Sequence, residues 1–272
     1  MGIVFLANPV FPSAYLRGKQ IAERINAAYN PVNAKDSDTF IMVKIWSPEI
    51  AQRKNVYVDL VDDHTPLWQL YKYPHVKVIA LSSMAANYIK ARVTNEVVVI
   101  PHHHCNFENV TRPAREVKTA GYCGISYGLN LDINELTRRL SNIGLEFRLL
   151  DYERPGVSRE QVCQFYSEID IQIAFRRPWL HKSIQPELKC PLKLINAGSF
   201  KVPTVAFPET SWHEGFDTFM HATSLDKLVD SCRTLKEDKE TYKHFAEKTY
   251  EFSQDYSIDK IMNLYLNLAK PR

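Results

Sequence analysis

Short apolar runs alternate with segments of helical periodicity along most of the chain. Five runs have the length and β-branched content of buried strands: Ile3–Ala7, Phe40–Ile45, Val56–Val61, Val76–Leu81 and Val97–Ile100. Apolar residues at helical spacing predict helices over Leu16–Tyr29, which Pro31 would end, and over Met84–Arg92, which Ser82 or Ser83 can cap. No apolar run reaches the roughly 18 residues that a membrane-spanning helix needs.

The periodicity lapses between His102 and Val117, where polar sequence indicates a linker, and a second series then begins. Its strands are predicted at Ala120–Cys123, Glu146–Leu150, Ile169–Phe175 and Pro203–Phe207. Helices are predicted after Asp132 and Ser158, which are placed as helix caps, over Pro191–Phe200, and over the last seventy residues.

This repeated alternation of strand and helix predicts an α/β protein with two parallel sheets. Because strand–helix–strand crossovers are right-handed, each half should be a Rossmann-like, doubly wound domain, and the two should face a cleft. We expect one domain over residues 1–104 and a second over residues 105–256. Ligands of such sheets bind beyond the carboxyl ends of the strands, so functional residues are expected in the loops that follow the strands.

Composition excludes several classes of protein. Hydrophobic residues make up 45% and charged residues 24%, which excludes a disordered, collagen-like or coiled-coil chain. A net charge of +3 is too small to indicate nucleic-acid binding. The five cysteines lack a CxxC pair and the N-terminus lacks a signal-peptide pattern, so a cytoplasmic location is expected. No strongly basic amphipathic helix argues for a membrane surface, and peripheral association stays open.

The strongest local signal for a ligand is a basic loop that leads into a helix beginning near Pro191. Free backbone N–H groups and the helix dipole attract anions at such an end, and a lysine in the first turn is unfavourable unless an anion lies there. Arginine adds bidentate geometry for phosphate oxygens. The pattern favours a diphosphate site over a solvated basic loop, with these candidate residues: Arg176, Arg177, Lys189 and Lys193.

The segment Cys190–Glu209 resembles the donor-binding stretch of GT-B fold glycosyltransferases, of the family 4 or group 1 kind. Those enzymes often carry S-P-N-K-L-x-E-A-x-A-x-G-x-P-V-V; Lys193, Ala197 and Pro203 match it. Three weaker likenesses accompany it: Gly121-Tyr-Cys-Gly124 to the glycine loop of the second domain, Ser224–Tyr256 to the terminal helices, and Val98–Pro101 to the strand before the linker. The resemblance covers about the last 175 residues, and the first hundred by topology only.

The resemblance implies a nucleoside-diphosphate sugar donor in the C-terminal domain and an acceptor in the N-terminal one. In that fold the final helix commonly crosses back to the N-terminal domain, which would place residues 257–272 against it. Contacts to the donor sugar and ribose are expected from Asn196, Glu209 and Glu214. The alternative for the two glutamates is that they are solvated charges of a loop. Asn196 stands where the family usually has a glutamate, so the sequence leaves open whether configuration at the transferred carbon is retained or inverted.

An inverting transfer needs a general base near the acceptor hydroxyl. Asp62 and Asp63 follow the strand Val56–Val61 directly, at its ligand-facing end, and either is a candidate base; capping of the following helix is their commoner use. His102, in the His102–Cys105 run, is a third candidate, against the alternatives of a polar linker and a zinc site. No metal is expected, because GT-B enzymes as a family do not need a divalent ion.

The sequence therefore predicts a metal-independent glycosyltransferase that acts on a carbohydrate or lipid-linked acceptor or a small molecule. Two rivals stay open. One is a catalytically silent nucleotide- or sugar-binding partner protein, which the asparagine at position 196 favours. The other is a nucleotide-sugar epimerase of the same architecture, which would act without an acceptor.

Overall fold

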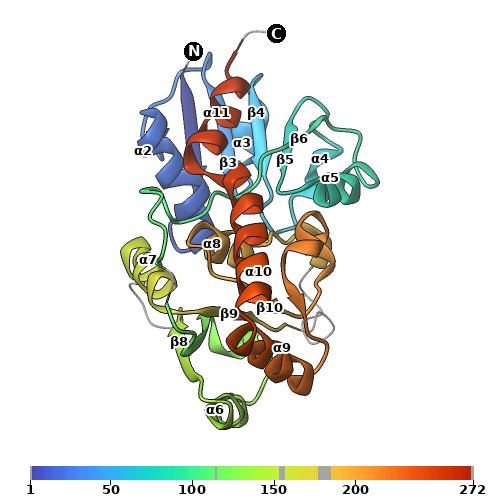
Figure 1. The fold of residues 1–272 in the computed structure, drawn as a ribbon. Helices are drawn as coiled ribbons and strands as arrows, with labels where there is room; N and C mark the ends of the chain where they lie inside the picture. Colours follow the sequence, from blue (N-terminus) through green and yellow to red (C-terminus); the bar gives the residue numbers. More distant parts are fainter. Residues whose placement is uncertain (1, 114, 153–156, 177–184, 271–272) are drawn as a thin grey trace. The chain divides into compact units, whose positions relative to one another are not determined.

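The computed structural model describes residues 2–113, 115–152, 157–176 and 185–270. The chain divides into two compact units. Unit 1 comprises Met1–His102, Lys182–Cys190 and Ile258–Arg272, and unit 2 comprises His103–His181 and Pro191–Ser257. Each unit is built around one parallel sheet, as Figure 1 shows.

The sheet of unit 1 has the strand order β2-β1-β3-β4-β5-β6, and all its neighbouring strands run parallel. The strands are β1 (Ile3–Ala7), β2 (Ala28–Tyr29), β3 (Thr39–Val43), β4 (Val56–Asp59), β5 (Lys77–Ala80) and β6 (Val97–Val99). β2 lies on one side of β1 and β3 on the other, so the chain reverses its direction of growth between β1 and β3. Ligands of open α/β sheets bind beyond the carboxyl ends of the strands at such a point.

Helices cover both faces of this sheet. They are α1 (Pro12–Ala14), η1 (Tyr15–Gln20), α2 (Ile21–Ile25), α3 (Pro48–Ala51), α4 (Leu67–Leu70), α5 (Ser83–Lys90), η4 (Pro186–Leu188) and α11 (Ile258–Leu268). The core on one face joins Val4 of β1 to side chains of α3, α4 and α5. Successive strand residues point to opposite faces, and Phe5 meets Tyr265 of α11 edge to face, with the ring centroids 5.4 Å apart.

The helix predicted over Leu16–Tyr29 is wrong at its end. The helical segment stops at Ile25, and the next residue, Asn26, takes a left-handed conformation with φ 52°. This conformation is a common way to end a helix, and asparagine adopts it more readily than most residues. Ala28–Tyr29 then pairs with β1 as the edge strand β2.

The sheet of unit 2 has the order β11-β10-β9-β7-β8, again parallel throughout. The strands are β7 (Thr119–Gly124), β8 (Glu146–Asp151), β9 (Ile171–Ala174), β10 (Thr204–Ala206) and β11 (Met220–His221). Here the chain reverses between β7 and β9. The edge strand β11 is too short to have been recognised in the sequence.

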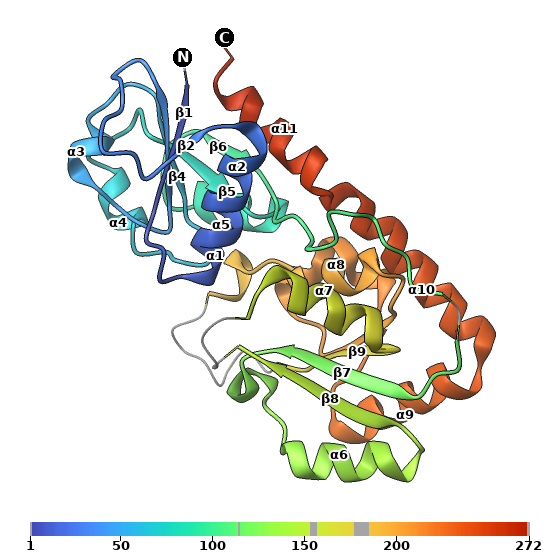
Figure 2. The ribbon, with the colours of Figure 1, turned by 90° about the vertical axis from the view of Figure 1, so that its left-hand side faces the viewer.

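Two helices of unit 2, α6 (Ile133–Asn142) and α7 (Arg159–Glu168), begin at the caps that the sequence indicates. The other helical segments of the unit are η2 (Ser126–Leu129), α8 (Leu192–Ser199), η5 (Thr210–Thr218), α9 (Leu225–Glu237), α10 (Lys239–Ser253) and η6 (Gln254–Tyr256). Asp132 accepts from the backbone at the start of α6, and Ser158 forms a reciprocal capping box with Gln161 at α7. Figure 2 shows α7 and α8 on one face of the sheet and α6 and α9 on the other. The expected pair of doubly wound parallel sheets is confirmed.

Helix α8 packs closely against α10 because residue 198 has no side chain. A Cβ atom added at Gly198 would lie 2.3 Å from the backbone oxygen of Thr249 in α10. The two helices could not keep this contact with any other residue at position 198. This packing fixes the helix that carries Lys193.

Candidate functional site

The carboxyl end of the unit 2 sheet gathers a lysine, a tyrosine and a glycine at its switch point. Lys193, in the first turn of α8, places its Nζ over the ring of Tyr122, 5.0 Å from the ring centroid. Gly124 ends β7 with φ 153°, and a Cβ there would lie 2.6 Å from the same Nζ. The glycine therefore leaves space for the ammonium group at the end of β7, where a phosphate of a ligand is expected in this topology.

Arg176 follows β9 at the same edge of the sheet and forms an ion pair with Glu209, which follows β10. Glu209 is buried, with 5% of its side chain exposed, so it holds the guanidinium in place. A guanidinium carries five N–H donors, so the pair with Glu209 leaves donors of Arg176 that can bind a phosphate. Arg177, the neighbouring candidate, lies outside the described residues. Glu214 lies in η5 and accepts a hydrogen bond from the Tyr256 hydroxyl at 3.4 Å.

Two other predicted residues of unit 2 make contacts within the fold. The side-chain oxygen of Asn196, which is 6% exposed, accepts from the backbone N–H of Cys105 at 2.9 Å. Gly121 faces α7, and a Cβ there would lie 2.7 Å from both Ile169 and Phe165. Asn196 thus ties the linker to α8, and Gly121 allows α7 to pack closely on β7.

In unit 1, the carboxyl ends of β3 and β4 carry a network of one carboxylate between two lysines. Asp62 pairs with Lys44, which follows β3, at 2.6 Å, and with Lys189. Lys44 and Val61 both take positive φ, 52° and 56°. This conformation is a genuine outlier for a β-branched residue such as valine, and strain of this kind clusters at functional sites.

The network makes Asp62 a weak base. Burial by itself would raise the pKa of Asp62, but Lys189 and Lys44 outweigh it and hold that pKa well below its ordinary value. Lys189 therefore joins Asp62 in unit 1, whereas Lys193 and Arg176 lie in unit 2.

Asp63 differs from its neighbour in having no lysine partner among the described residues. Its Oδ1 accepts from the backbone N–H of Thr65 at 2.9 Å, in a turn before α4, whose N-cap residue is Pro66. His102 is buried, with 5% of it exposed, at the end of the first segment of unit 1.

The site also contains residues that the sequence analysis missed. Lys44 had a readable signal, since it is a cation directly after a fully buried strand. Tyr122 had none, because an aromatic residue inside a strand is typical of a core.

Arg17, buried in η1, donates to Asp59 at 2.6 Å and to the backbone oxygens of Ile100 and Pro101. The Tyr265 hydroxyl of α11 donates to the same Asp59 at 2.9 Å. This buried cluster anchors α11 to the sheet of unit 1.

Neither a cluster of metal ligands nor a membrane-spanning helix occurs in the described residues. They contain no group of three or more histidine, cysteine, aspartate or glutamate side chains arranged to hold a metal ion. No helix in the same residues has the length and apolar character needed to cross a membrane.

Known families and curated proteins offer no match to the sequence. Solved structures do match the fold. TarM of S. aureus, in a complex with fondaparinux, α-GlcNAc-glycerol and UDP, aligns with TM-score 0.59 and 14% identity over 87% of this chain. HepE of Anabaena, with UDP and glucose, aligns with TM-score 0.62 and 12% identity over 98% of this chain and 99% of HepE. OtsA without ligand aligns with TM-score 0.60 and 7% identity, over 88% of this chain and 74% of OtsA.

The chain spans 56% of the length of TarM and nearly all of HepE. At these identities the likeness shows the fold. The neighbours are glycosyltransferases, and the chain has the GT-B glycosyltransferase fold.

Proposed function

We propose that this protein is a glycosyltransferase that moves a sugar from a nucleoside-diphosphate donor to a carbohydrate or lipid-linked acceptor or a small molecule. The observation that carries the proposal is the position of Lys193 beside Gly124, at the switch point of the unit 2 sheet. A cation at the amino end of α8 is matched to a diphosphate. The complexes of HepE and TarM with UDP support this class of donor.

Charge develops on the diphosphate as the bond to the sugar breaks, and positioned cations stabilise that charge without reorganising. Lys193 and Arg176 would supply this stabilisation, with Glu209 orienting Arg176. We also propose that Asn196 and Glu214 contact the ribose and the sugar of the donor. Gly121 would belong to the glycine loop, and Lys189 would contact the diphosphate. Asn196 would have only its amide nitrogen for this purpose, because Cys105 occupies its oxygen.

For the acceptor side we propose Asp63 as the general base of an inverting transfer. Asp62 is a poor proton acceptor, because its two lysine partners stabilise the ionised carboxylate. Asp62 would instead order Lys44 and Lys189. His102 is a weaker candidate, since only 5% of it is exposed. An Asp63→Asn variant is expected to lose at least about a hundredfold in kcat while it still binds donor.

The first experiment is a thermal-shift panel with UDP, GDP, ADP, CMP and dTDP. A ligand at about 100 times its Kd stabilises a folded protein by about 2.7 kcal/mol, which moves the melting temperature by a few degrees. We expect one diphosphate to give this shift in the wild type and in Lys248→Ala, an exposed control on α10. Lys193→Ala and Lys193→Gln should lose it. No shift with any nucleotide would overturn the donor site.

Turnover of the matching sugar nucleotide, with and without cell-extract glycans and lipids, then separates the alternatives. Turnover that depends on the extract supports a transferase. Turnover without it indicates the epimerase, and binding without turnover indicates the silent partner protein. We also propose that transfer needs no divalent metal; activity that disappears in EDTA and returns with Mg²⁺ or Mn²⁺ would contradict this.

A further inference from the structure

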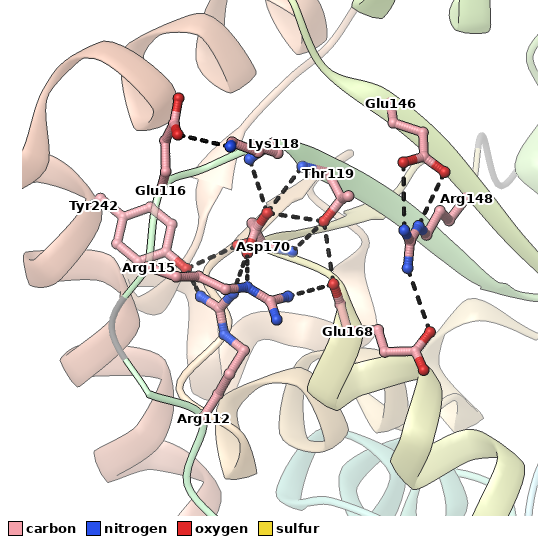
Figure 3. Close-up of polar contacts among 10 residues, drawn as sticks. All are labelled: Arg112, Arg115, Glu116, Lys118, Thr119, Glu146, Arg148, Glu168, Asp170 and Tyr242. Atoms are coloured by element: carbon pink, nitrogen blue, oxygen red, sulfur yellow. Dashed lines mark hydrogen bonds and ion pairs between the residues drawn. The ribbon is translucent and has the colours of Figure 1, made fainter.

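A second cluster of charged residues lies at the opposite, amino end of the unit 2 sheet, and Figure 3 shows it. Asp170 comes directly before β9, and its carboxylate accepts from the backbone N–H groups of Lys118 and Thr119 at 2.8 and 2.9 Å. Arg112 and Arg115 both pair with its Oδ1, Arg115 at 2.7 Å. One buried carboxylate therefore faces two guanidinium groups.

An open cavity of about 560 Å³ lies next to this cluster. Part of its lining is apolar, with Pro113, Val117, Leu235 and Ala246, and the ring of Tyr242 joins them. Its volume is within the range of about 300–1,000 Å³ that is usual for small-molecule sites. These side chains, here called the apolar floor, give a ring or a short aliphatic group apolar surface against which it could pack.

The charged part of the lining is predominantly positive. Six cationic side chains line the cavity among the described residues: Arg112, Arg115, Lys201, Lys236, Lys239 and Lys243. The carboxylates in the lining are Glu116 and Glu247, and each already pairs with a lysine, Lys118 and Lys201 respectively. Arg112 and Arg115 share Asp170, and Lys236 donates to the backbone oxygens of Ile143 and Gly144. The excess of positive charge in the lining is therefore carried by the other two lysines, Lys239 and Lys243.

Lys239 and Lys243 carry this excess most clearly. They stand one turn apart at the beginning of α10, exposed, and within the described part of the chain no carboxylate lies within 4 Å of either ammonium group. The amino end of α10 is itself capped, because the Asp238 carboxylate accepts from the backbone N–H groups of Glu240 and Thr241. An anion in the cavity would therefore be held by the charges of the two lysines. Arg112 adds a third element, since its side chain is 4% exposed and its Nε has no partner.

We propose that this cavity is a second ligand site, separate from the donor site, which binds a phosphate monoester joined to a ring. Such a phosphate carries a charge of about −1.5 to −2 at pH 7, which matches Lys239 and Lys243. The ring or apolar body would lie on Val117, Leu235 and the Tyr242 ring. The donor candidates Lys193, Gly124 and Arg176 are at the other end of the same strands, so the two sites do not share residues.

Isothermal titration with phenyl phosphate tests the proposal, with glucose 1-phosphate and inorganic phosphate as further arms. Phenyl phosphate is expected to bind the wild type, and the double variant Lys239→Ala/Lys243→Ala to lose about tenfold or more in affinity, the effect of removing charged hydrogen bonds. Lys248→Ala removes one charge from the same helix outside the cavity lining and should keep wild-type affinity. Lys193→Ala should also keep it.

The arms distinguish the sources of the phosphate and the competing explanations. Tighter binding of phenyl phosphate or of glucose 1-phosphate identifies an apolar or a sugar ring as the preferred body. Equal binding of inorganic phosphate would overturn the role of the apolar floor and with it the ring-bearing ligand. Loss of all binding in Lys193→Ala would assign it to the donor site, and an equal loss in Lys248→Ala would reduce it to surface charge. Both outcomes overturn the proposal and leave the proposed transferase function untouched.

Discussion

Each unit contains a cluster of arginine, aspartate and tyrosine side chains around one buried carboxylate, and the two clusters differ in their charge balance. In unit 1, Arg17 and Asp59 are 1% and 0% exposed, and Tyr265 donates to the same carboxylate. In unit 2, Asp170 serves Arg112 and also the half-exposed Arg115, and Tyr242 accepts from Arg112 and donates to the Asp170 backbone oxygen at 2.9 Å.

The number of guanidinium groups that face each buried aspartate distinguishes a structural anchor from a region that can bind an anion. Asp59 has a single guanidinium partner, two backbone oxygens take further Arg17 donors, and no solvent reaches the pair. A buried ion pair satisfied in this way is an anchor that is costly to break. Asp170 is outnumbered, and its cluster borders a cavity with more cations. The same three residue types therefore close one region and leave the other able to receive an anion.

The largest expected effect is that of Asp59→Asn. The substitution would leave the Arg17 guanidinium buried without its counter-charge, which typically costs about 3–5 kcal/mol of stability. Urea denaturation should show a clear drop in the unfolding midpoint. Asp36→Asn removes an aspartate that is 94% exposed from its pair with Arg53, and is expected to cost about 1 kcal/mol or less. Equal effects of the two substitutions would contradict the anchor role.

Asp170→Asn should cost less, about 2–3 kcal/mol, because Arg115 can turn to solvent and Arg112 keeps Tyr242. Calorimetry should resolve the loss against Asp230→Asn, in an exposed pair with Arg233. The substitution also adds one net positive charge beside the cavity. Phenyl phosphate should therefore bind it more tightly than it binds the wild type; weaker binding would separate the cluster from the proposed site.

The two tyrosines sharpen the comparison with a smaller effect. Tyr265→Phe removes a hydrogen bond to a buried carboxylate and should cost about 1.5–3 kcal/mol, as bonds to charged groups do. Tyr242→Phe removes a donor to a backbone oxygen and an acceptor for a guanidinium that keeps Asp170. Hydrogen exchange should show faster opening of α11 in Tyr265→Phe and little change in that helix in Tyr242→Phe.

Acid should remove the contribution that the ionised Asp170 makes to stability. Burial by itself raises the pKa of Asp170, but Arg115, the backbone N–H of Lys118, Thr119 and Arg112 lower it below its ordinary value. The contribution of Asp170 is therefore present above about pH 4, the value for an unfolded aspartate, and is lost as pH falls through the lower folded pKa. The stability difference between wild type and Asp170→Asn should be full at pH 7 and shrink towards pH 2. A constant difference would contradict the charge argument.

Most of the fold could be predicted because its signals are local. Runs such as Val56–Val61 and caps such as Ser158 are visible in a few consecutive residues, and the sheets and helices follow from them. The failures occur where a distant contact decides the structure. The helix predicted to Tyr29 stops at Ile25, because Ala28–Tyr29 pairs with β1 as a strand instead of continuing the helix.

The candidate site was less accessible to prediction because its partners are far apart in the sequence. The loop position of Lys193 and Arg176 followed from the pattern of strands and helices. That Asp62 would pair with Lys189, 127 residues away, did not, and neither did the burial of Arg17, which the sequence presents as one more cation on a helix surface. Charge partners set the chemistry of a carboxylate, and they are assigned only by the tertiary fold.

The anchoring of α11 in unit 1 has a consequence for synthesis on the ribosome. Tyr265 reaches Asp59 across 206 residues of sequence, and unit 1 is assembled from three separate segments. At roughly 5–20 residues per second, many seconds pass between the emergence of Asp59 and that of its tyrosine partner. All the strands of unit 2 have been synthesised before Tyr265 emerges. The domain that begins to be translated first is thus the last to be completed, and until then Arg17 and Asp59 lack the helix that covers them.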